Sequence, residues 1–533
     1  MTSRSLRAGA IGLFVVLAFI IFATFQDYGM SWDEQLQNTY GQLLLAYYSS
    51  GFQDRAAFSY INLFLYGGFF DLVAAVVNLV SPFGEYETRH LLGGLMFLVG
   101  LAGGWKLAKL LAGERAALVA VVCLATTPLL YGHAFINPKD SPLAWLLVWT
   151  SYFACRLLEQ RDKPSWSMIA GFGLSMGLAI GTRVVAIVYL TYAVAVWSVA
   201  AAARILEGES ISTVMQRLKS KAIPIGVGLL VTVITTIIVW PWAAQAPFNV
   251  VEALNAFTHF AFYPDVLWNG ALIPAHQLPV TYLPGLLLLQ LPEYMLAGFG
   301  TAIVFGALAW KGNVARVLSQ IKAQQYLLVA LSIAAPIGGY LLLHPTVYNG
   351  LRHFLFVVPP LVIVAAIGLT RLIEATSARH AVAGIGLGAA LALAIARQAS
   401  LMAGLHPYEY ASYNSLIGGM AGAKDRFEMD YWGTTLKESG KALGDYIAHD
   451  PSAASLQGRT AKIFACGDPN QVQQALPQGT EFTGDLGEAD FYLGMQGVHC
   501  FESFSGPVRR VREVTRLGTP LGYVLDLRPQ TSP

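Results

Sequence analysis

Long apolar runs dominate the sequence. A transmembrane helix needs about twenty consecutive apolar residues, and runs of roughly that length recur along the first three quarters of the chain. They lie near residues 8–26, 89–108, 116–135, 141–158, 166–182, 184–203, 222–241, 285–309, 325–343, 353–370 and 380–397. The pattern predicts an α-helical polytopic membrane protein with about eleven transmembrane helices.

The positions of Lys and Arg orient these spans. If the spans alternate in direction, the basic clusters all fall on one side, which the positive-inside rule makes cytoplasmic. The clusters comprise Arg4, Arg7, Lys106, Lys109, Arg115, Arg156, Arg161, Lys163, Arg204, Arg217, Lys219, Lys221, Lys311, Arg316, Lys322, Arg371 and Arg379. We therefore expect the N-terminus inside and the C-terminus outside. Segment 61–80 is apolar, but counting it as a span would invert this order, so we expect it to form interfacial helices.

The composition changes near residue 401. Residues 1–400 are expected to form the membrane domain, with outer loops at 27–88 and 242–284. Residues 401–533 are richer in polar side chains and are long enough for one small extracytoplasmic domain. Short apolar stretches at 462–465, 490–493 and 522–525 are typical of strands, and 436–447 of a helix. This predicts a small α/β domain at the C-terminus.

Overall composition supports a membrane protein and gives no argument for nucleic acid. Of the 533 residues, 55% are hydrophobic and 12% charged, and the net charge is +2. The four cysteines form no CxxC pair, which excludes a cysteine-rich zinc module. Cys466 and Cys500 lie in the polar C-terminal part, where they can form a disulfide if that part is outside the cytoplasm.

The first candidate site follows the first apolar run. Ser31 and Glu34 have the spacing of a capping box, which predicts a helix on the membrane surface with Asp33 at its start. In one interpretation both acids only cap this helix. In the other, Asp33 and Glu34 are catalytic acids at the mouth of the first span, with Asp33 as a general base.

A second polar group precedes the fourth span. Lys139 and Asp140 stand between Pro138 and Pro142. Asp140 is either a helix-start charge or a second catalytic carboxylate, and Lys139 is a candidate phosphate ligand. Arg183 interrupts a long apolar stretch, so it either binds substrate in a cavity or extends to the lipid headgroups.

Two later outer loops complete the set of candidates. Tyr348, Arg352 and His353 lie at the start of the tenth span, where a guanidinium and an imidazole suit a lipid-linked phosphate. The alternative is interfacial anchoring. Loop 242–284 combines aromatic rings with polar groups, including His259, and is typical of a sugar-binding lid. Its histidines lack tight metal-ligand spacing, so the metal site stays unknown.

These motifs resemble a known superfamily. The Asp33-Glu34 pair in a first outer loop, the run Asn137 to Pro142 and the run Tyr348 to His353 resemble GT-C polytopic glycosyltransferases. The resemblance is to the bacterial branch related to protein O-mannosyltransferases and lipid A aminoarabinose transferase. It extends through residues 406–414 to Asp430-Tyr431-Trp432-Gly433.

The resemblance implies transfer of a sugar, hexosyl or pentosyl, from a polyprenyl-phosphate donor to a hydroxyl of a glycan, lipid or protein acceptor. It implies inversion at the anomeric carbon, with Asp33 as the base and Asp140 as a second outer-loop acid. It also implies a place in the bacterial inner membrane, with the site facing the periplasm. A divalent cation, Mg²⁺ or Mn²⁺, is left open, and the sequence carries no separate match to an acceptor-recognition motif.

Two other functions compete with this interpretation. A lipid or sugar-lipid transporter or flippase would place its polar groups near the bilayer midplane, whereas here they gather at span ends on one side. A membrane scaffold that binds a partner through its C-terminal part would need none of the candidate side chains.

Overall fold

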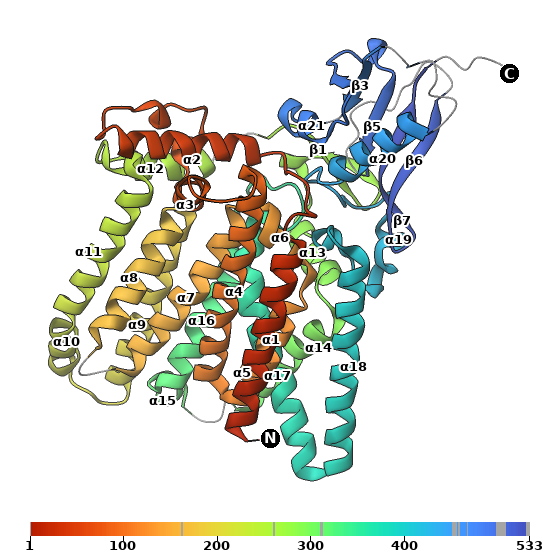
Figure 1. Ribbon diagram of the computed structural model, residues 1–533. Helices are drawn as coiled ribbons and strands as arrows, with labels where there is room; N and C mark the ends of the chain where they lie inside the picture. Colours follow the sequence, from red (N-terminus) through yellow and green to blue (C-terminus); the bar gives the residue numbers. More distant parts are fainter. Residues whose placement is uncertain are drawn as a thin grey trace.

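A bundle of roughly parallel helices forms the body of the protein in the computed structural model (Figure 1). The structure describes residues 2–160, 164–258, 262–309, 313–449, 456, 459–465, 467–496 and 508–528. Within these residues, seven helical segments are long and apolar enough to cross a membrane. They are α1 (Ser3–Thr24), α4 (Glu85–Ala112), η3 with α9 (Val184–Leu206), α11 (Ala222–Val239), α16 (Ile321–Leu343), η6 with α17 (Arg352–Arg379) and α18 (Ala381–Leu405).

The other four predicted spans coincide with helices of less regular form. Two are broken: α5 (Glu114–Ala125) bends by 59° into α6 (Pro128–Ile136), and α13 (Tyr282–Gln290) bends by 113° into α14 (Glu293–Ala309). A proline at or just before each second helix cannot continue the preceding hydrogen-bond ladder, which accounts for the breaks. The remaining two are α7 (Asp140–Glu159) and the shorter α8 (Trp166–Ile180), which lie alongside the other helices (Figure 1). The predicted polytopic helical fold is confirmed.

The basic loops meet at one end of the bundle. Ion pairs join the N-terminal segment to the α4–α5 turn through Arg7 and Glu114, and this turn to α17 through Arg115 and Glu374. The N-terminus lies at this end, and the C-terminal sheet lies at the other (Figure 1). The loops therefore divide between the two ends as the charge pattern predicts.

Short elements cover the opposite end. Helix α2 (Glu34–Ser49) lies across the tops of the spans, and α3 (Phe69–Asn78) lies beneath it (Figure 1). Segment 61–80 contains the short helices η2 (Leu63–Leu65) and α3 and no helix of spanning length, and its predicted interfacial position stays a prediction. Loop 242–284 contributes α12 (Asn249–Thr258) and a hairpin of β1 (Asp265–Trp268) and β2 (Ala271–Pro274). Short helices α10 (Ile211–Ser220) and α15 (Val314–Leu318) lie at the basic end.

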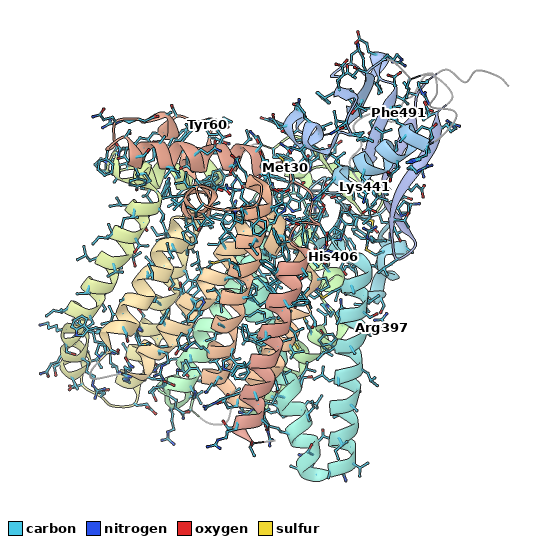
Figure 2. All side chains as sticks on the ribbon, viewed as in Figure 1. Met30, Tyr60, Arg397, His406, Lys441 and Phe491 are labelled. Carbon is cyan, nitrogen blue, oxygen red and sulfur yellow. The ribbon has the colours of Figure 1, made fainter. Side chains whose placement is uncertain are left out.

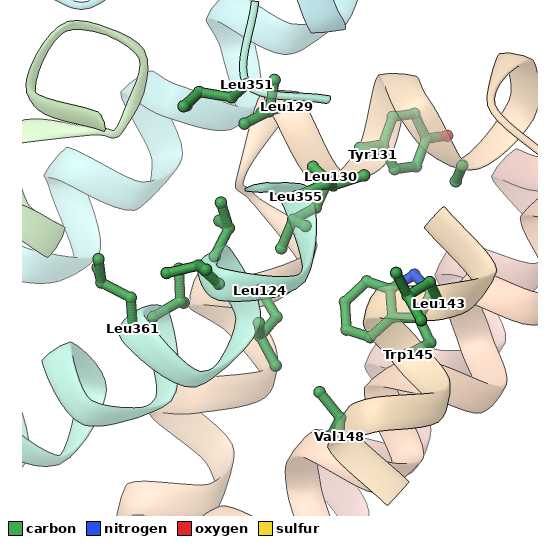
Figure 3. Close-up of a cluster of buried hydrophobic side chains, with 14 of the residues drawn as sticks. Leu124, Leu129, Leu130, Tyr131, Leu143, Trp145, Val148, Leu351, Leu355 and Leu361 are labelled. Carbon is green, nitrogen blue, oxygen red and sulfur yellow. The ribbon is translucent and has the colours of Figure 1, made fainter. Parts of the chain in front are cut away.

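Close packing fixes the helices that carry the candidate residues. A Cβ on Gly100 of α4 would lie 2.1 Å from the Trp145 ring of α7, so only glycine lets these two helices approach so closely. Figure 3 shows the adjoining core, a cluster of buried apolar side chains that includes Leu143, Trp145, Leu351 and Leu355. All four side chains are buried. Asp140 and Arg352 therefore stand on backbone held by a rigid apolar layer.

The C-terminal sheet has five strands in the order β4-β3-β5-β7-β6. Strands β3 (Ala461–Ala465), β4 (Thr480–Phe482) and β5 (Phe491–Met495) run parallel, and β7 (Thr519–Asp526) pairs antiparallel with β5 and β6 (Arg509–Arg516). Helices α20 (Leu436–His449) and α21 (Pro469–Ala475) pack with it. The predicted small α/β region is present.

The segment that joins the two parts packs with the membrane domain. Tyr408, Tyr410, Phe427, Tyr431 and Trp432 belong to the same hydrophobic core as the spans, whereas a separate core begins at Leu436. We call residues 406–435, which include α19 (Gly419–Ala423), the strap. The domain boundary at residue 401 stays a prediction. The core of the membrane domain continues to Trp432 and also includes Val514 and Leu521 of the sheet.

Candidate active site

Asp33 lies at the start of α2, and its carboxylate does not cap the helix. It is the N-cap residue, but its side chain makes no capping hydrogen bond. The Ser31 backbone N–H instead donates to Glu34 Oε2 at 3.1 Å, which is half of the predicted capping box, while Ser31 Oγ donates to the Ile136 carbonyl. The Asp33 side chain is 40% exposed. Its carboxylate is therefore free to face a substrate.

Two cations from distant parts of the chain approach Asp33. Lys139 Nζ lies 3.9 Å from Asp33 Oδ2, and Arg352 Nη1 lies 3.8 Å from the same oxygen. Both distances exceed a direct hydrogen bond. The three side chains thus surround a common space without saturating one another.

Aromatic rings hold these cations in place. Lys139 Nζ lies 4.5 Å from the centre of the Tyr66 ring. The Arg352 guanidinium lies between Tyr348 and Trp432, at 4.6 and 4.8 Å from the two ring centres. Cation–π contacts fix a guanidinium without using its N–H donors. Arg352 Nε is buried and has no hydrogen-bond partner in the described structure, so Arg352 retains donors for an anionic ligand.

The Asp140 carboxylate has closer hydrogen-bond and ion-pair partners than the Asp33 carboxylate. It forms an ion pair with Arg183 and accepts a hydrogen bond from Asn137 Nδ2 at 3.0 Å. Asn137 also contacts His133, whose Nε2 lies 2.9 Å from the Tyr431 hydroxyl. Only 7% of the Asp140 side chain is exposed. Asp140 therefore sits at the centre of a hydrogen-bonded network that links α6 and α7 to the strap.

Arg183 lies at the same end of the bundle, between α8 and α9. Its guanidinium carbon is 5.8 Å from the centre of the Tyr66 ring, on which Lys139 also lies. Its side chain is 18% exposed and is paired with Asp140. The alternative in which Arg183 extends to the headgroups is therefore not the arrangement observed. We call Asp33, Lys139, Asp140, Arg183 and Arg352 the outer cluster.

Glu34 occupies a different environment from its neighbour Asp33. Its side chain is 1% exposed and lies 3.2 Å from His90 Nε2 and 3.7 Å from Arg89 Nε. Arg89 Nη2 in turn donates to Asp71 Oδ1 at 2.6 Å. We call Glu34, Asp71, Arg89 and His90 the buried network. The structure does not bring Glu34 together with the other predicted site residues.

The remaining predicted residues lie beside Arg352. The Tyr348 ring stacks on Phe262 of loop 242–284 at 3.6 Å, and the His353 ring meets Tyr348 edge-on at 4.7 Å. His353 Nδ1 is buried without a hydrogen-bond partner in the described part of the chain. His259 lies outside the described residues, as do Cys466 and Cys500, so their predicted roles stay predictions.

Sequence reasoning assigned no role to several side chains that complete the site. Tyr66 lies in the apolar segment 61–80, which gave no polar signal. Tyr431 and Trp432 were part of the resemblance but had no assigned chemistry. Glu428 lies in the strap near Arg352, and burial raises the pKa of its carboxyl group to about 8. The signal that could have found them is the return of an aromatic-rich segment after the last span.

The charges of the outer cluster do not balance. Lys139, Arg183 and Arg352 carry three positive charges, whereas Asp33 and Asp140 carry two negative ones. Burial lowers the pKa of Lys139, and the nearby Asp33 and Asp71 carboxylates oppose that shift. A site with excess positive charge and unpaired N–H donors favours an anion such as a phosphate.

Metal ligands do not gather in the described ranges. No group of three or more His, Cys, Asp or Glu side chains there is placed to hold a metal ion. The outer cluster offers only Asp33 and Asp140, and Asp140 is paired with Arg183. The divalent cation left open by the sequence stays open, because Mg²⁺ can be held by one or two carboxylates together with substrate phosphates.

One known family model matches part of the membrane domain. Residues 74–242 match the model of the dolichyl-phosphate-mannose-protein mannosyltransferase family. This match confirms the predicted GT-C resemblance. The matched segment contains Lys139, Asp140 and Arg183 and covers less than half of the chain. A search of curated proteins found no match.

Solved GT-C structures are similar at low identity. ArnT from Cupriavidus metallidurans bound to undecaprenyl phosphate is 14% identical, with a TM-score of 0.46 over 97% of this chain and 98% of that one. AglB from Archaeoglobus fulgidus, in complex with an inhibitory peptide and a dolichol-phosphate, is 10% identical, with a TM-score of 0.49 over 91% and 69%. The mycobacterial arabinofuranosyltransferase AftD is 13% identical, with a TM-score of 0.40 over 99% and 42%. These values assign no substrate or residue role to this chain.

Proposed function

We propose that the protein transfers a sugar from a polyprenyl-phosphate donor to an acceptor hydroxyl, with inversion and with Asp33 as the general base. One observation carries the proposal. Lys139 Nζ and Arg352 Nη1 each lie within 4 Å of Asp33 Oδ2 at one end of the bundle. A base and two cations that do not saturate one another suit a reaction between a hydroxyl and a sugar phosphate. The family match over residues 74–242 supports the same chemistry.

Asp33 would act on the acceptor. A hydroxyl is a weak nucleophile at neutral pH, so a carboxylate within hydrogen-bond reach takes its proton as the new bond forms. The acceptor oxygen attacks the anomeric carbon, and the bond from that carbon to the phosphate oxygen breaks. The electron pair of that bond stays on the phosphate. Attack from the face opposite the leaving group gives inversion.

Lys139 and Arg352 would act on the donor. The leaving phosphate gains negative charge as the glycosidic bond breaks, so fixed cations stabilise the transition state more than the ground state. The aromatic rings around Arg352 keep its fork in one orientation, which reduces the entropy lost on binding. His353 and Tyr348 extend this phosphate-binding surface in our proposal, and Arg183 supports it through the shared Tyr66 ring.

Asp140 and Glu34 would act indirectly. Asp140 holds Arg183 and links α7 to the strap, so we propose it as a positioning residue instead of a second catalytic acid. Glu34 anchors the first turn of α2 through Arg89 and His90. Its effect on Asp33 would come through the position of the helix start.

We place the site on the outer, periplasmic face of a bacterial inner membrane. The outer cluster lies at the end of the bundle opposite the basic loops, which the positive-inside rule assigns to the cytoplasm. A membrane-embedded enzyme suits a donor whose polyprenyl tail stays in the bilayer. A transporter or flippase is less consistent with this arrangement, because the charged residues gather at one end of the spans.

Donor consumption tests the proposal. Purified protein is incubated with a panel of polyprenyl-phosphate sugars, hexosyl and pentosyl, together with a crude envelope extract as the acceptor. Mass spectrometry then identifies the lipid that is consumed, with and without a chelator. We expect one donor to be converted to free polyprenyl phosphate by the wild type and not by Asp33→Asn. Equal conversion by both proteins, or movement of intact donor across vesicles without conversion, would contradict the proposal.

A further inference from the structure

A second polar cavity lies apart from the outer cluster. It has a volume of about 310 Å³ and is formed by the α13–α14 elbow, α18 and the strap. Its lining includes Gln290, Glu293, Arg397, Gln398 and Tyr413, and none of the outer-cluster residues. A volume of this size suits a small polar group. The mechanism proposed above makes no use of it.

Gln290 indicates that this cavity binds a ligand. Its side chain is 98% buried, yet neither its amide nitrogen nor its amide oxygen has a hydrogen-bond partner within the described structure. A buried amide left unpaired is costly, and such groups in folded proteins usually meet a ligand or water. The elbow itself is firmly built, because Asn414 Nδ2 donates to the Leu288 and Leu291 carbonyls.

The depth of the cavity matches the headgroup region of the bilayer. Helix α18 is apolar from Ala381 to Ala396, which is about 24 Å of helix and close to the thickness of the hydrocarbon core. Arg397 and Gln398 follow this run directly. Figure 2 shows Arg397 below His406 on the outer flank of α18. Only 11% of the apolar window of this helix is buried inside the protein, which is what a helix that borders lipid requires.

The cavity carries one positive and one negative side chain, a combination that suits a zwitterionic ligand. Arg397 supplies one guanidinium and Glu293 one carboxylate, and no other lining residue is ionised at neutral pH. These two groups form no ion pair within 4 Å, whereas Ser415 donates its N–H to Glu293 Oε1 at 2.6 Å. A guanidinium suits a phosphodiester. The second carboxylate oxygen and the Gln290 amide suit an ammonium group and an ester or hydroxyl oxygen.

We propose that this cavity binds the headgroup of a zwitterionic aminophospholipid, of the phosphatidylethanolamine class. The phosphodiester lies against Arg397, the ammonium group donates to Glu293, and Gln290 bonds the glycerol ester region. The acyl chains lie along α18 in the bilayer. The strap, which forms one wall of the cavity and also carries Tyr431 and Trp432 of the active site, links this lipid to the outer cluster.

Native mass spectrometry in nanodiscs tests the lipid assignment. The full chain is reconstituted in equal parts of phosphatidylethanolamine, phosphatidylglycerol and phosphatidylcholine with matched acyl chains, and the lipids retained after ejection are counted. We expect phosphatidylethanolamine to be retained at least about tenfold over phosphatidylcholine, because charge-assisted hydrogen bonds to the ammonium group are lost in the trimethylated headgroup. Glu293→Gln should abolish this preference, whereas Arg397→Ala and Gln290→Leu, which remove contacts to groups that all three lipids share, should lower the retention of all three.

Arg379→Ala, at the far end of α17, is the matched control because it removes an exposed arginine outside the cavity. It should keep the wild-type preference. Arg397 is itself exposed, so its substitution leaves the fold intact even if Gln290→Leu does not. Equal retention of the three lipids, or a preference unchanged in Glu293→Gln, would overturn the proposal. Displacement by free glycerophosphoethanolamine at the same concentration as the lipid would assign the cavity to a soluble ligand instead.

Discussion

Two neighbouring carboxylates, Asp33 and Glu34, differ in their exposure to solvent and in how closely other side chains surround them. Asp33 faces the outer cluster, is 40% exposed and stays 3.8 to 3.9 Å from its cations. Glu34 turns into the buried network, is 1% exposed and contacts Ser31, Arg89 and His90 at 3.1 to 3.7 Å. A buried carboxylate enclosed by hydrogen bonds and ion pairs helps to hold the fold together, whereas an exposed carboxylate that stands off from its cations is left for a substrate.

This comparison predicts which substitutions act on folding and which act on rate. The largest expected effect is in the buried network. Arg89→Ala leaves Asp71 and Glu34 as uncompensated buried charges, so we expect a loss of about 3–5 kcal/mol in stability. Thermal unfolding of the detergent-purified protein measures it. Arg379→Ala, at an exposed position, is the control. An equal unfolding temperature in both variants would show that the buried network does not stabilise the fold.

The outer cluster should respond in rate and not in stability. Arg352→Ala removes a guanidinium next to the donor phosphate, so we expect transfer to fall by about 10²–10³-fold. Arg352→Lys keeps the charge but not the planar fork, and it should recover only part of this loss. Steady-state transfer rates with the identified donor measure both. Full activity in Arg352→Ala would show that this residue does not bind the donor.

Glu428 sharpens the comparison because it is a half-buried acid near an outer-cluster cation. Its pKa of about 8 lies above the ordinary value of 4.5, so the folded protein binds a proton that the unfolded chain releases. Stability should therefore decline as the pH rises from about 4.5 to 8. Ionised Glu428 also competes with the donor for Arg352. We expect Glu428→Gln to keep wild-type activity at pH 7 and to retain more of it than the wild type at pH 9, as a pH–rate profile would show.

The smallest effect is expected at His406, which joins the end of α1 to the strap through Asp27 and Glu409. These carboxylates raise the pKa of His406 above 6.5, against the opposing effect of burial. Their contribution is complete below pH 6.5 and is lost as the pH rises through the folded-state pKa. His406→Gln should cost less than about 1 kcal/mol at pH 6 and almost nothing at pH 9. Unfolding temperatures at the two pH values test this, and a loss that is equal at both would contradict it.

Much of the fold could be predicted because a membrane-spanning helix can be recognised from a short run of consecutive apolar residues. Each apolar run that was assigned as a span forms a helix or a bent pair of helices, and the basic clusters predicted which loops share an end of the bundle. The strand at Arg509–Arg516 was missed because charged residues occupy most of its positions, as is common at an exposed sheet edge. The second broken span was predicted as one run, since a single proline in an apolar sequence does not reveal an angle of 113°.

The site was predicted only in part, because it depends on contacts between residues that are far apart in the sequence. Asp33, Lys139 and Arg352 could be placed together because all three follow or precede spans at the same end. The sequence could not separate Asp33 from Glu34, because the direction in which α2 presents each side chain depends on Arg89 and His90, more than fifty residues away. Trp432 reaches Arg352, and Tyr431 reaches His133, only because the strap folds back over the spans, which no local pattern encodes.

Paired substitution of the two neighbouring acids tests the central claim most directly. Transfer rate and unfolding temperature are measured for Asp33→Asn and Glu34→Gln in the same membrane preparation. The account predicts that Asp33→Asn loses about 10²–10⁴-fold in rate with an unchanged unfolding temperature, whereas Glu34→Gln lowers the unfolding temperature. Wild-type transfer by Asp33→Asn at an unchanged unfolding temperature would contradict the assignment of Asp33 as the base.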